Sequence, residues 1–171
     1  REIDQALAAH RDTVFKELAG LAPNETIVDV FRIKYDYHNA KVILKAEAMN
    51  SDESGLMSGS GRVAPQAMLA AYNEDRCRDL PGGLGAAMEE AKGVLARSAN
   101  PQLADFVLDK AYFAELAGLA EALDSEFLTG YVAILADSTN LKSAVRTLRM
   151  GKDADFMRQA LVPGGNVSPA R

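Results

Sequence analysis

The chain has 171 residues, of which 48% are hydrophobic and 25% are charged, and its formal net charge is −5. This is the composition of a globular domain long enough to bury a core, and its acidic balance disfavours nonspecific binding to nucleic acid or anionic lipid. The single cysteine, Cys77, excludes an intrachain disulfide, and no apolar run exceeds six residues, which excludes a membrane span within this sequence.

Apolar spacing predicts helices in the first half of the chain. The first helix ends at Pro23, and the second, capped by Asn24 or Thr26, runs to about Asn50 without Gly or Pro. Residues 50–61 are rich in Ser, Gly and Asp and predict a loop, after which Pro65 opens a short helix to residue 74. A fourth helix follows the turn at 81–83. The apolar faces of the first and fourth helices are Ile3, Leu7, Val14, Leu18 and Leu21, and Leu84, Met88, Ala91 and Leu95.

The second half repeats this plan. Asn100 caps a helix that Pro101 opens, Asp124 or Ser125 caps a long helix that Gly151 ends, and a short helix covers about residues 153–161. The inward residues predicted for the first of these helices are Leu103, Val107, Phe113, Leu116 and Ala120. Residues 27–33 and 42–44 are locally β-prone, but their long amphipathic flanks favour helix. We therefore expect an all-α fold of packed helical hairpins without a sheet.

Three segments of the sequence occur twice, in the same order. FKELAGLA at 15–22 returns as FAELAGLA at 113–120, DYHNAK at 36–41 returns as DSTNLK at 137–142, and GRVAP at 61–65 returns as GNVSP at 165–169. The offsets are 98, 101 and 104 residues, which indicates a duplicated unit of about 100 residues. We expect one unit over residues 1–97 and a second, truncated unit over 98–171, within a piece of a longer protein.

Both long helices carry the motif Asp-x-x-Asn-x-Lys-x-x-x-(Lys/Arg). Its members are Asp36, Asn39, Lys41 and Lys45 in the first copy and Asp137, Asn140, Lys142 and Arg146 in the second. Asp and Asn three residues apart share a helix face, and short polar side chains are poor helix formers, so we expect hydrogen bonds to an adjacent helix or loop. The apolar stripe beside them is Ile33, Tyr37, Ala40 and Leu44, matched by Ile134, Ser138, Leu141 and Val145.

Basic residues follow helical spacing beside this motif. They are Lys34, His38, Lys41 and Lys45 in the first copy, and Lys142, Arg146 and Arg149 in the second. Two interpretations remain open: a solvated helix face, or a docking surface for an acidic partner. The candidate residues of the motif are therefore either structural or partner-docking residues.

Other chemistry has little support. The glycines at 59, 61, 164 and 165 precede helix starts without the Lys-Ser/Thr of a phosphate-binding loop, and positive-φ turns explain them better. A metal site would have only Asp36 and His38, and the second copy has Thr139 in place of His38. Cys77 lies between two arginines that could lower its pKa, and we expect it to be exposed at a helix end. No catalytic residue, cofactor or metal is predicted.

Several motifs together resemble the C subunit of A-type and V-type rotary ATPases, the counterpart of the d subunit in the eukaryotic enzyme. They are KYDYHNAK at 34–41 followed by LKA at 44–46, LDKAYF at 108–113, Asp137-x-x-Asn140-Leu141-Lys142-x-x-x-Arg146, and Gly164-Gly165. The resemblance extends from about Ile3 to Pro169. It implies that the chain is a fragment of a funnel-shaped, three-unit helical protein.

The resemblance also implies a function. The C subunit is a non-catalytic socket of the central stalk that receives the central shaft and seats on the membrane rotor ring. It couples the two in proton or sodium transport linked to ATP synthesis or hydrolysis. The implied partners are therefore ring and shaft subunits, and the implied location is the cytoplasmic face of the membrane, held there by protein contacts only. The alternatives are a generic helical-repeat adaptor and, more remotely, a metal-dependent hydrolase using Asp36 and His38.

Overall fold

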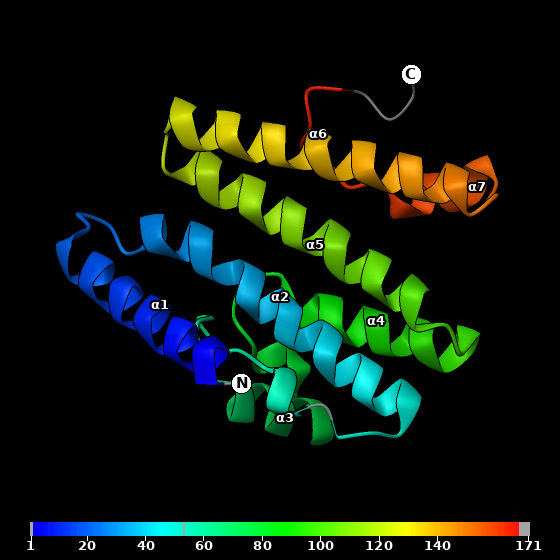
Figure 1. Ribbon diagram of the computed structural model, residues 1–171, viewed down its shortest axis with the longest axis horizontal. Helices are drawn as coiled ribbons and strands as arrows, with labels where there is room; N and C mark the ends of the chain where they lie inside the picture. Colours follow the sequence, from blue (N-terminus) through cyan, green and yellow to red (C-terminus); the bar gives the residue numbers. More distant parts are fainter. Residues whose placement is uncertain (1, 53, 168–171) are drawn as a thin grey trace.

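The computed structural model describes residues 2–52 and 54–167 (Figure 1). Seven α-helices are joined by short loops and two single 3₁₀ turns, and no strand occurs among the described residues, so the predicted all-α class is confirmed. The helices are α1 (Glu2–Leu21), α2 (Thr26–Met49), α3 (Pro65–Asn73), α4 (Leu84–Ser98), α5 (Pro101–Ala122), α6 (Glu126–Arg149) and α7 (Ala154–Ala160), with 3₁₀ turns η1 (Ser54–Leu56) and η2 (Cys77–Asp79).

Local chemistry sets most helix ends where the sequence predicts them. The Asn100 side chain accepts a hydrogen bond from the Gln102 N–H at 3.0 Å, with Pro101 next to it, and Ser125 accepts one from the Leu128 N–H at 3.3 Å. These bonds satisfy N–H groups that have no partner in the first helical turn. At α2 the cap position is Glu25, which makes no side-chain cap bond. Asn24 still accepts from the Thr26 N–H at 2.9 Å.

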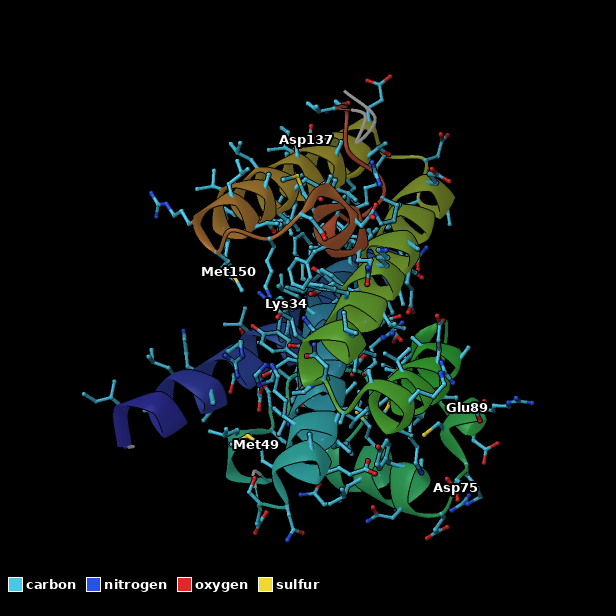
Figure 2. The ribbon with its side chains drawn as sticks, turned by 90° about the vertical axis from the view of Figure 1, so that its right-hand side faces the viewer. Lys34, Met49, Asp75, Glu89, Asp137 and Met150 are labelled. Carbon is cyan, nitrogen blue, oxygen red and sulfur yellow. The ribbon has the colours of Figure 1, made fainter. Side chains whose placement is uncertain are left out.

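Helix α2 lies at the centre of the molecule. It packs against α4 and α5, and α5 packs in turn against α6, which lies along one edge (Figure 1). The largest core cluster includes Tyr37 and Leu44 of α2, Met88 of α4 and Leu108 of α5. Figure 2 shows Asp137 of α6 at the opposite end of the molecule from Asp75, which follows α3.

The apolar face of α5 is partly different from the predicted one. Phe113, Leu116 and Ala120 are buried as predicted. Leu103 and Val107 are only half-buried, because the neighbouring positions of Ala104 and Leu108 face α2 and α4 and have no exposed surface. The buried stripe is therefore displaced by one residue from the predicted one at this end of the helix.

The two apolar stripes that match in sequence do not match in burial. Ile33, Ala40 and Leu44 of α2 are at most 1% exposed, whereas their counterparts Ile134, Leu141 and Val145 of α6 are 67%, 67% and 41% exposed. The prediction of a buried stripe on α6 is therefore wrong for these residues. Helix α6 packs on α5 through Leu128, Val132 and Ala136 instead.

Candidate functional site

Each long helix holds a loop further along the chain with one asparagine: α2 holds the loop after η1, and α6 holds the loop after α7. The Asn39 amide accepts a hydrogen bond from the Ser58 N–H and donates one to the Ser58 carbonyl, both at 2.8 Å. Asn140 does the same with Val162, at 2.8 and 2.9 Å. A primary amide has a donor and an acceptor side by side. One asparagine side chain can therefore bind both the N–H and the carbonyl of a loop residue, which have no partner in a helix or sheet.

Each long helix also holds the loop with one aspartate. Asp36 Oδ1 accepts from the Val63 N–H at 3.1 Å. Asp137 accepts from the N–H groups of Asn166 and Val167, each at 3.1 Å. The predicted hydrogen bonds between the motif and an adjacent loop are therefore present in both halves. We call each Asp–Asn pair with its loop a polar clamp: Asp36 and Asn39 form the first, and Asp137 and Asn140 the second.

A glycine lets the loop approach the aspartate in both clamps. A Cβ atom on Gly61 would lie 2.2 Å from Asp36 Oδ1, and one on Gly165 would lie 2.1 Å from Asp137 Oδ1. The predicted positive φ occurs at Gly164, at +91°, but the prediction is wrong for Gly59. It is also wrong for Gly61 and Gly165. At those two positions glycine is needed because a carboxylate lies too close for a Cβ atom, and not because the backbone has a positive φ. Ser168 and Pro169 of the repeated segment lie outside the described residues.

The first clamp extends into a cluster of charges between α2 and α5. Arg62 Nε lies 2.8 Å from Asp36 Oδ2, and Arg62 Nη1 lies 2.8 Å from Glu115 Oε1. The Tyr37 hydroxyl donates to Glu115 Oε2 at 2.8 Å, and the Gly83 N–H points at the same oxygen at 3.3 Å. We call Asp36, Tyr37, Arg62 and Glu115 the Arg62 cluster. It joins α2, the loop before α3, the start of α4, and α5.

Burial sets the protonation behaviour of this cluster. It raises the pKa of the Asp36 carboxyl, and the hydrogen bonds from Arg62 and Val63 offset only part of that rise. Burial and the neighbouring Glu115 carboxylate raise the pKa of Tyr37. Burial alone would lower the pKa of Arg62, but hydrogen bonds to Asp36 and Glu115 outweigh it and raise that pKa. Arg62 therefore stays charged between its two carboxylates.

The sequence patterns do not single out Arg62, Tyr37 and Glu115 as one site. A signal is nevertheless present: Glu115 and its match Glu17 stand at the same place of the repeated FxELAGLA segment. In the second clamp Asn166 occupies the position of Arg62, so no such cluster can form there.

The basic members of the motif differ between the two helices. Lys41 Nζ lies 2.5 Å from Asp109 Oδ1, and Lys45 Nζ lies 2.8 Å from Asp105 Oδ2, so both lysines contact α5. Their counterparts Lys142 and Arg146 are exposed and make no ion pair with any described residue. Helix α5 thus pairs with the Lys41 and Lys45 half of the basic stripe of α2, while Lys34 and His38 are exposed and do not contact α5. On α6, Lys142 and Arg146 are open.

The residues considered for a metal-dependent hydrolase lie apart. The Asp36 carboxylate faces Arg62 and Val63, whereas His38 Nε2 lies 3.0 Å from the Leu56 carbonyl. No group of three or more His, Cys, Asp or Glu residues within the described part of the chain could hold a metal ion. Cys77 is buried rather than exposed as predicted, because it packs into the main core, and burial raises its pKa. The chain presents no reactive thiolate at this position.

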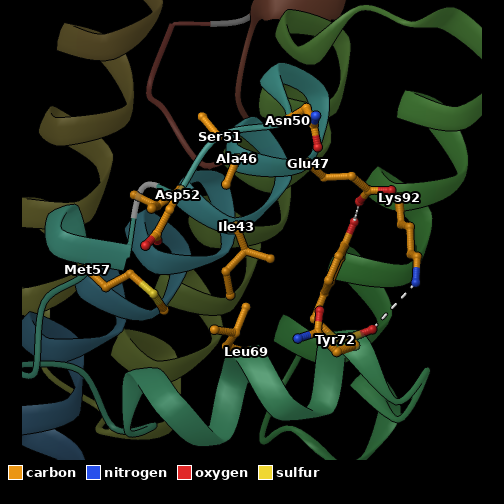
Figure 3. A pocket seen from close by; sticks show the side chains of 12 residues that line it. Ile43, Ala46, Glu47, Asn50, Ser51, Asp52, Met57, Leu69, Tyr72 and Lys92 are labelled. Carbon is orange, nitrogen blue, oxygen red and sulfur yellow. Dashed lines mark hydrogen bonds between the residues drawn. The ribbon is translucent and has the colours of Figure 1, made fainter.

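A groove of about 610 Å³ lies between the end of α2, α3 and α4 (Figure 3). The Tyr72 hydroxyl donates to Glu47, and Lys92 Nζ lies 4.5 Å from the centre of the Tyr72 ring and 2.6 Å from Asp75 Oδ1. Glu47 and Lys92 therefore both have partners within the chain. The groove offers apolar surface from Ile43 and Leu69 but no unpaired charge on Glu47 or Lys92 to orient a ligand.

Comparison with known proteins places the whole chain in one family. The C subunit of the V-type sodium ATPase of Enterococcus hirae is 24% identical over 167 residues, which cover 98% of this chain and 51% of that protein. The V-type ATP synthase C subunits of two Thermus thermophilus strains are 23% identical over 169 residues, which cover 92% of this chain and 51% of each relative. The chain thus spans about half the length of these relatives.

No solved structure gives a significant match. None of the helices in residues 2–52 and 54–167 combines the length and hydropathy needed to cross a membrane. The family described as ATP synthase (C/AC39) subunit matches residues 1–171, which is the entire sequence. The resemblance read from the repeated motifs is therefore confirmed, and the chain belongs to the ATP synthase (C/AC39) subunit family.

Proposed function

We propose that the chain is part of a non-catalytic central-stalk subunit that couples the rotor shaft of an A/V-type rotary ATPase to its membrane rotor ring. The observation that carries this proposal is the family match over all 171 residues, together with relatives named as the C subunits of V-type enzymes. The partners would be shaft and ring subunits, and the protein would sit at the cytoplasmic face of the membrane through protein contacts.

The structure supports a mechanical role. A subunit that transmits torque must keep its helices and loops in fixed relative positions. In this chain, paired hydrogen bonds at Asn39 and Asn140 tie each long helix to a loop further along the sequence. The Arg62 cluster ties α2 to α5 with two charge-assisted bonds in a largely buried setting. Such polar ties define one packing of the helices.

Two features of the fold agree with a docking subunit rather than an enzyme. The polar groups of the first clamp are directed at the chain's own loops, so they hold structure instead of facing a substrate cavity. The exposed residues include large apolar side chains on α1 and α6, such as Leu7, Phe127 and Leu141. Large apolar side chains left exposed on these helices agree with surfaces that a partner covers.

Affinity capture tests the proposal. The tagged full-length protein, expressed in its own cells, is purified from gently solubilised membranes, and the co-purifying proteins are identified by mass spectrometry. Ring and shaft subunits of a rotary ATPase are expected in stoichiometric amounts. An unrelated tagged helical protein of similar size and charge is the control. Capture of other proteins without any ATPase subunit would favour the helical-repeat adaptor and refute the socket.

A further inference from the structure

The exposed apolar stripe of α6 has a covered counterpart in the same chain. Ile134, Leu141 and Val145 stand at the positions that Ile33, Ala40 and Leu44 hold in α2. On α2 these positions are at most 1% exposed, because α4 and α5 cover Ala40 and Leu44, and α5 and α6 cover Ile33. On α6 the same positions are 67%, 67% and 41% exposed. We call Ile134, Leu141 and Val145, with the flanking Lys142 and Arg146, the α6 stripe.

Helix α5 shows what kind of surface covers such a stripe. Its small and apolar residues Ala104 and Leu108 pack in the same core cluster as Ala40 and Leu44. The residue after each of them is an aspartate, and Asp105 and Asp109 pair with Lys45 and Lys41. In this covering helix, a pair made of an apolar residue and the acidic residue after it occurs twice, four residues apart. Residues four apart lie on the same face of a helix, so the two pairs face the same neighbour.

The cations of the α6 stripe match this pattern. Lys142 and Arg146 stand at the positions of Lys41 and Lys45, and neither makes an ion pair with any described residue. They flank the exposed Leu141 and Val145. An apolar strip bordered by unpaired cations one helical turn apart is complementary in hydrophobicity and charge to a helix of the α5 type.

A folded second copy of the chain does not offer such a helix, because its α5 is already packed on its own α2 and α4, and its α1 lacks the acidic residues. Helix α1 matches α5 in the repeated FxELAGLA segment, at an offset of 98 residues. At this offset Leu7 stands where Asp105 does, and Arg11 stands where Asp109 does. Docked on α6, α1 would bring Arg11 toward Lys142 and provide no carboxylate for Arg146. Like charges disfavour this pairing.

We propose that the α6 stripe binds an amphipathic partner helix whose apolar face carries two acidic residues four positions apart, as Ala104-Asp105 and Leu108-Asp109 do on α5. The partner helix lies on α6 as α5 lies on α2, with its carboxylates facing Lys142 and Arg146. This inference rests on the internal packing of the chain and does not depend on the rotary-ATPase assignment.

A peptide of residues 101–122, labelled with fluorescein, is the probe, and fluorescence anisotropy measures its binding to the intact chain. The wild-type chain is expected to bind it. Lys142→Asp with Arg146→Asp should weaken binding about tenfold or more, since two partly exposed pairs become repulsive. A peptide carrying Asp105→Lys and Asp109→Lys should recover binding to this variant and lose binding to the wild type. Leu141→Asp should also abolish binding.

The matched control is Lys16→Asp with Arg97→Asp, which makes the same change of charge at exposed positions of α1 and α4. It should bind the wild-type peptide normally. Circular dichroism verifies that every variant is folded. Absence of binding to the wild-type chain, or equal binding by the α6 variant and the control, overturns the proposal. A dimer in sedimentation equilibrium that Leu141→Asp dissociates would show that a second copy covers the stripe, and it overturns the proposal as well.

Discussion

At the scale of single residues, the two polar clamps combine three requirements in a few side chains. The Asn39 amide forms hydrogen bonds with a backbone group of the loop, and the Asp36 carboxylate accepts hydrogen bonds from loop N–H groups. Gly61 has no side chain, so the loop can approach the carboxylate closely. The same three requirements are met at Asn140, Asp137 and Gly165. In the first clamp the loss of Asp36 leaves a buried N–H group without its acceptor, whereas the N–H groups that Asp137 binds in the second clamp are exposed.

Replacing the aspartates tests whether the clamps hold the fold. Asp36→Ala is expected to lower the free energy of unfolding by about 1–3 kcal/mol, because the buried Val63 N–H loses its acceptor, and Asp137→Ala by less, because the N–H groups of Asn166 and Val167 are exposed to water. The loss should be larger at Asp36, which is fully buried and would leave Arg62 short of one partner. Urea denaturation followed by circular dichroism measures it. A loss below about 0.3 kcal/mol for both variants would show that the aspartates are surface groups.

The glycines provide a steric test. Gly61→Ala should destabilise the chain by about 2–3 kcal/mol, because the added Cβ overlaps a carboxylate that buried bonds hold in place. Gly165→Ala should cost less, since Asp137 is only half-buried and can move. Gly20→Ala is the control: nothing lies within 4 Å of its Cβ, and alanine favours helix. Equal stability of Gly61→Ala and Gly20→Ala would contradict the close approach seen at Asp36.

The pKa of Asp36 leads to a prediction about pH. Because the folded-state pKa lies above the usual value of 3.8, the folded chain retains a proton at pH values where the unfolded chain has lost it. The stabilisation from this group is therefore complete below the usual value and is lost as the pH rises through the folded-state pKa. The difference in unfolding free energy between wild type and Asp36→Asn should thus fall with rising pH and then level off. A difference that grows with pH would contradict the raised pKa.

At the scale of helices, the sequence predicts where each element begins and ends better than which neighbour covers it. Pro101 with Asn100, and Gly151 after α6, are local signals that act within one turn, and the helices begin and end there. The stripe of Ile134 and Leu141 has the same periodicity as its counterpart on α2, yet it is exposed. Periodicity identifies an apolar face, but only tertiary packing decides whether another element covers it.

The contact between α2 and α5 can be tested by exchanging charges. Lys41→Asp and Asp109→Lys should each destabilise the chain, and the double exchange should recover part of the loss. The coupling should be about 0.5–1 kcal/mol for a pair that is partly exposed. The control is the same exchange at the ion pair of Arg78 and Glu89. The Arg78 side chain is 82% exposed, so the coupling energy of this pair should be smaller. Losses that simply add for Lys41 and Asp109 would show that the pair does not interact.

At the scale of the whole molecule, the all-α class could be predicted from the helical spacing of apolar residues, and the family from the sequence motifs. The Arg62 cluster could not, since it forms only when the loop before α3 meets α5. The division into units of residues 1–97 and 98–171, and a funnel shape, remain predictions.

Ion transport tests the central claim most directly. Membrane vesicles are prepared with the rotary ATPase lacking this protein and again after the full-length protein is added back, and ATP-driven ion uptake is measured beside ATP hydrolysis. If the protein couples the shaft to the ring, its removal abolishes uptake while hydrolysis by the catalytic head continues, and its return restores uptake. Undiminished uptake in its absence would contradict the account.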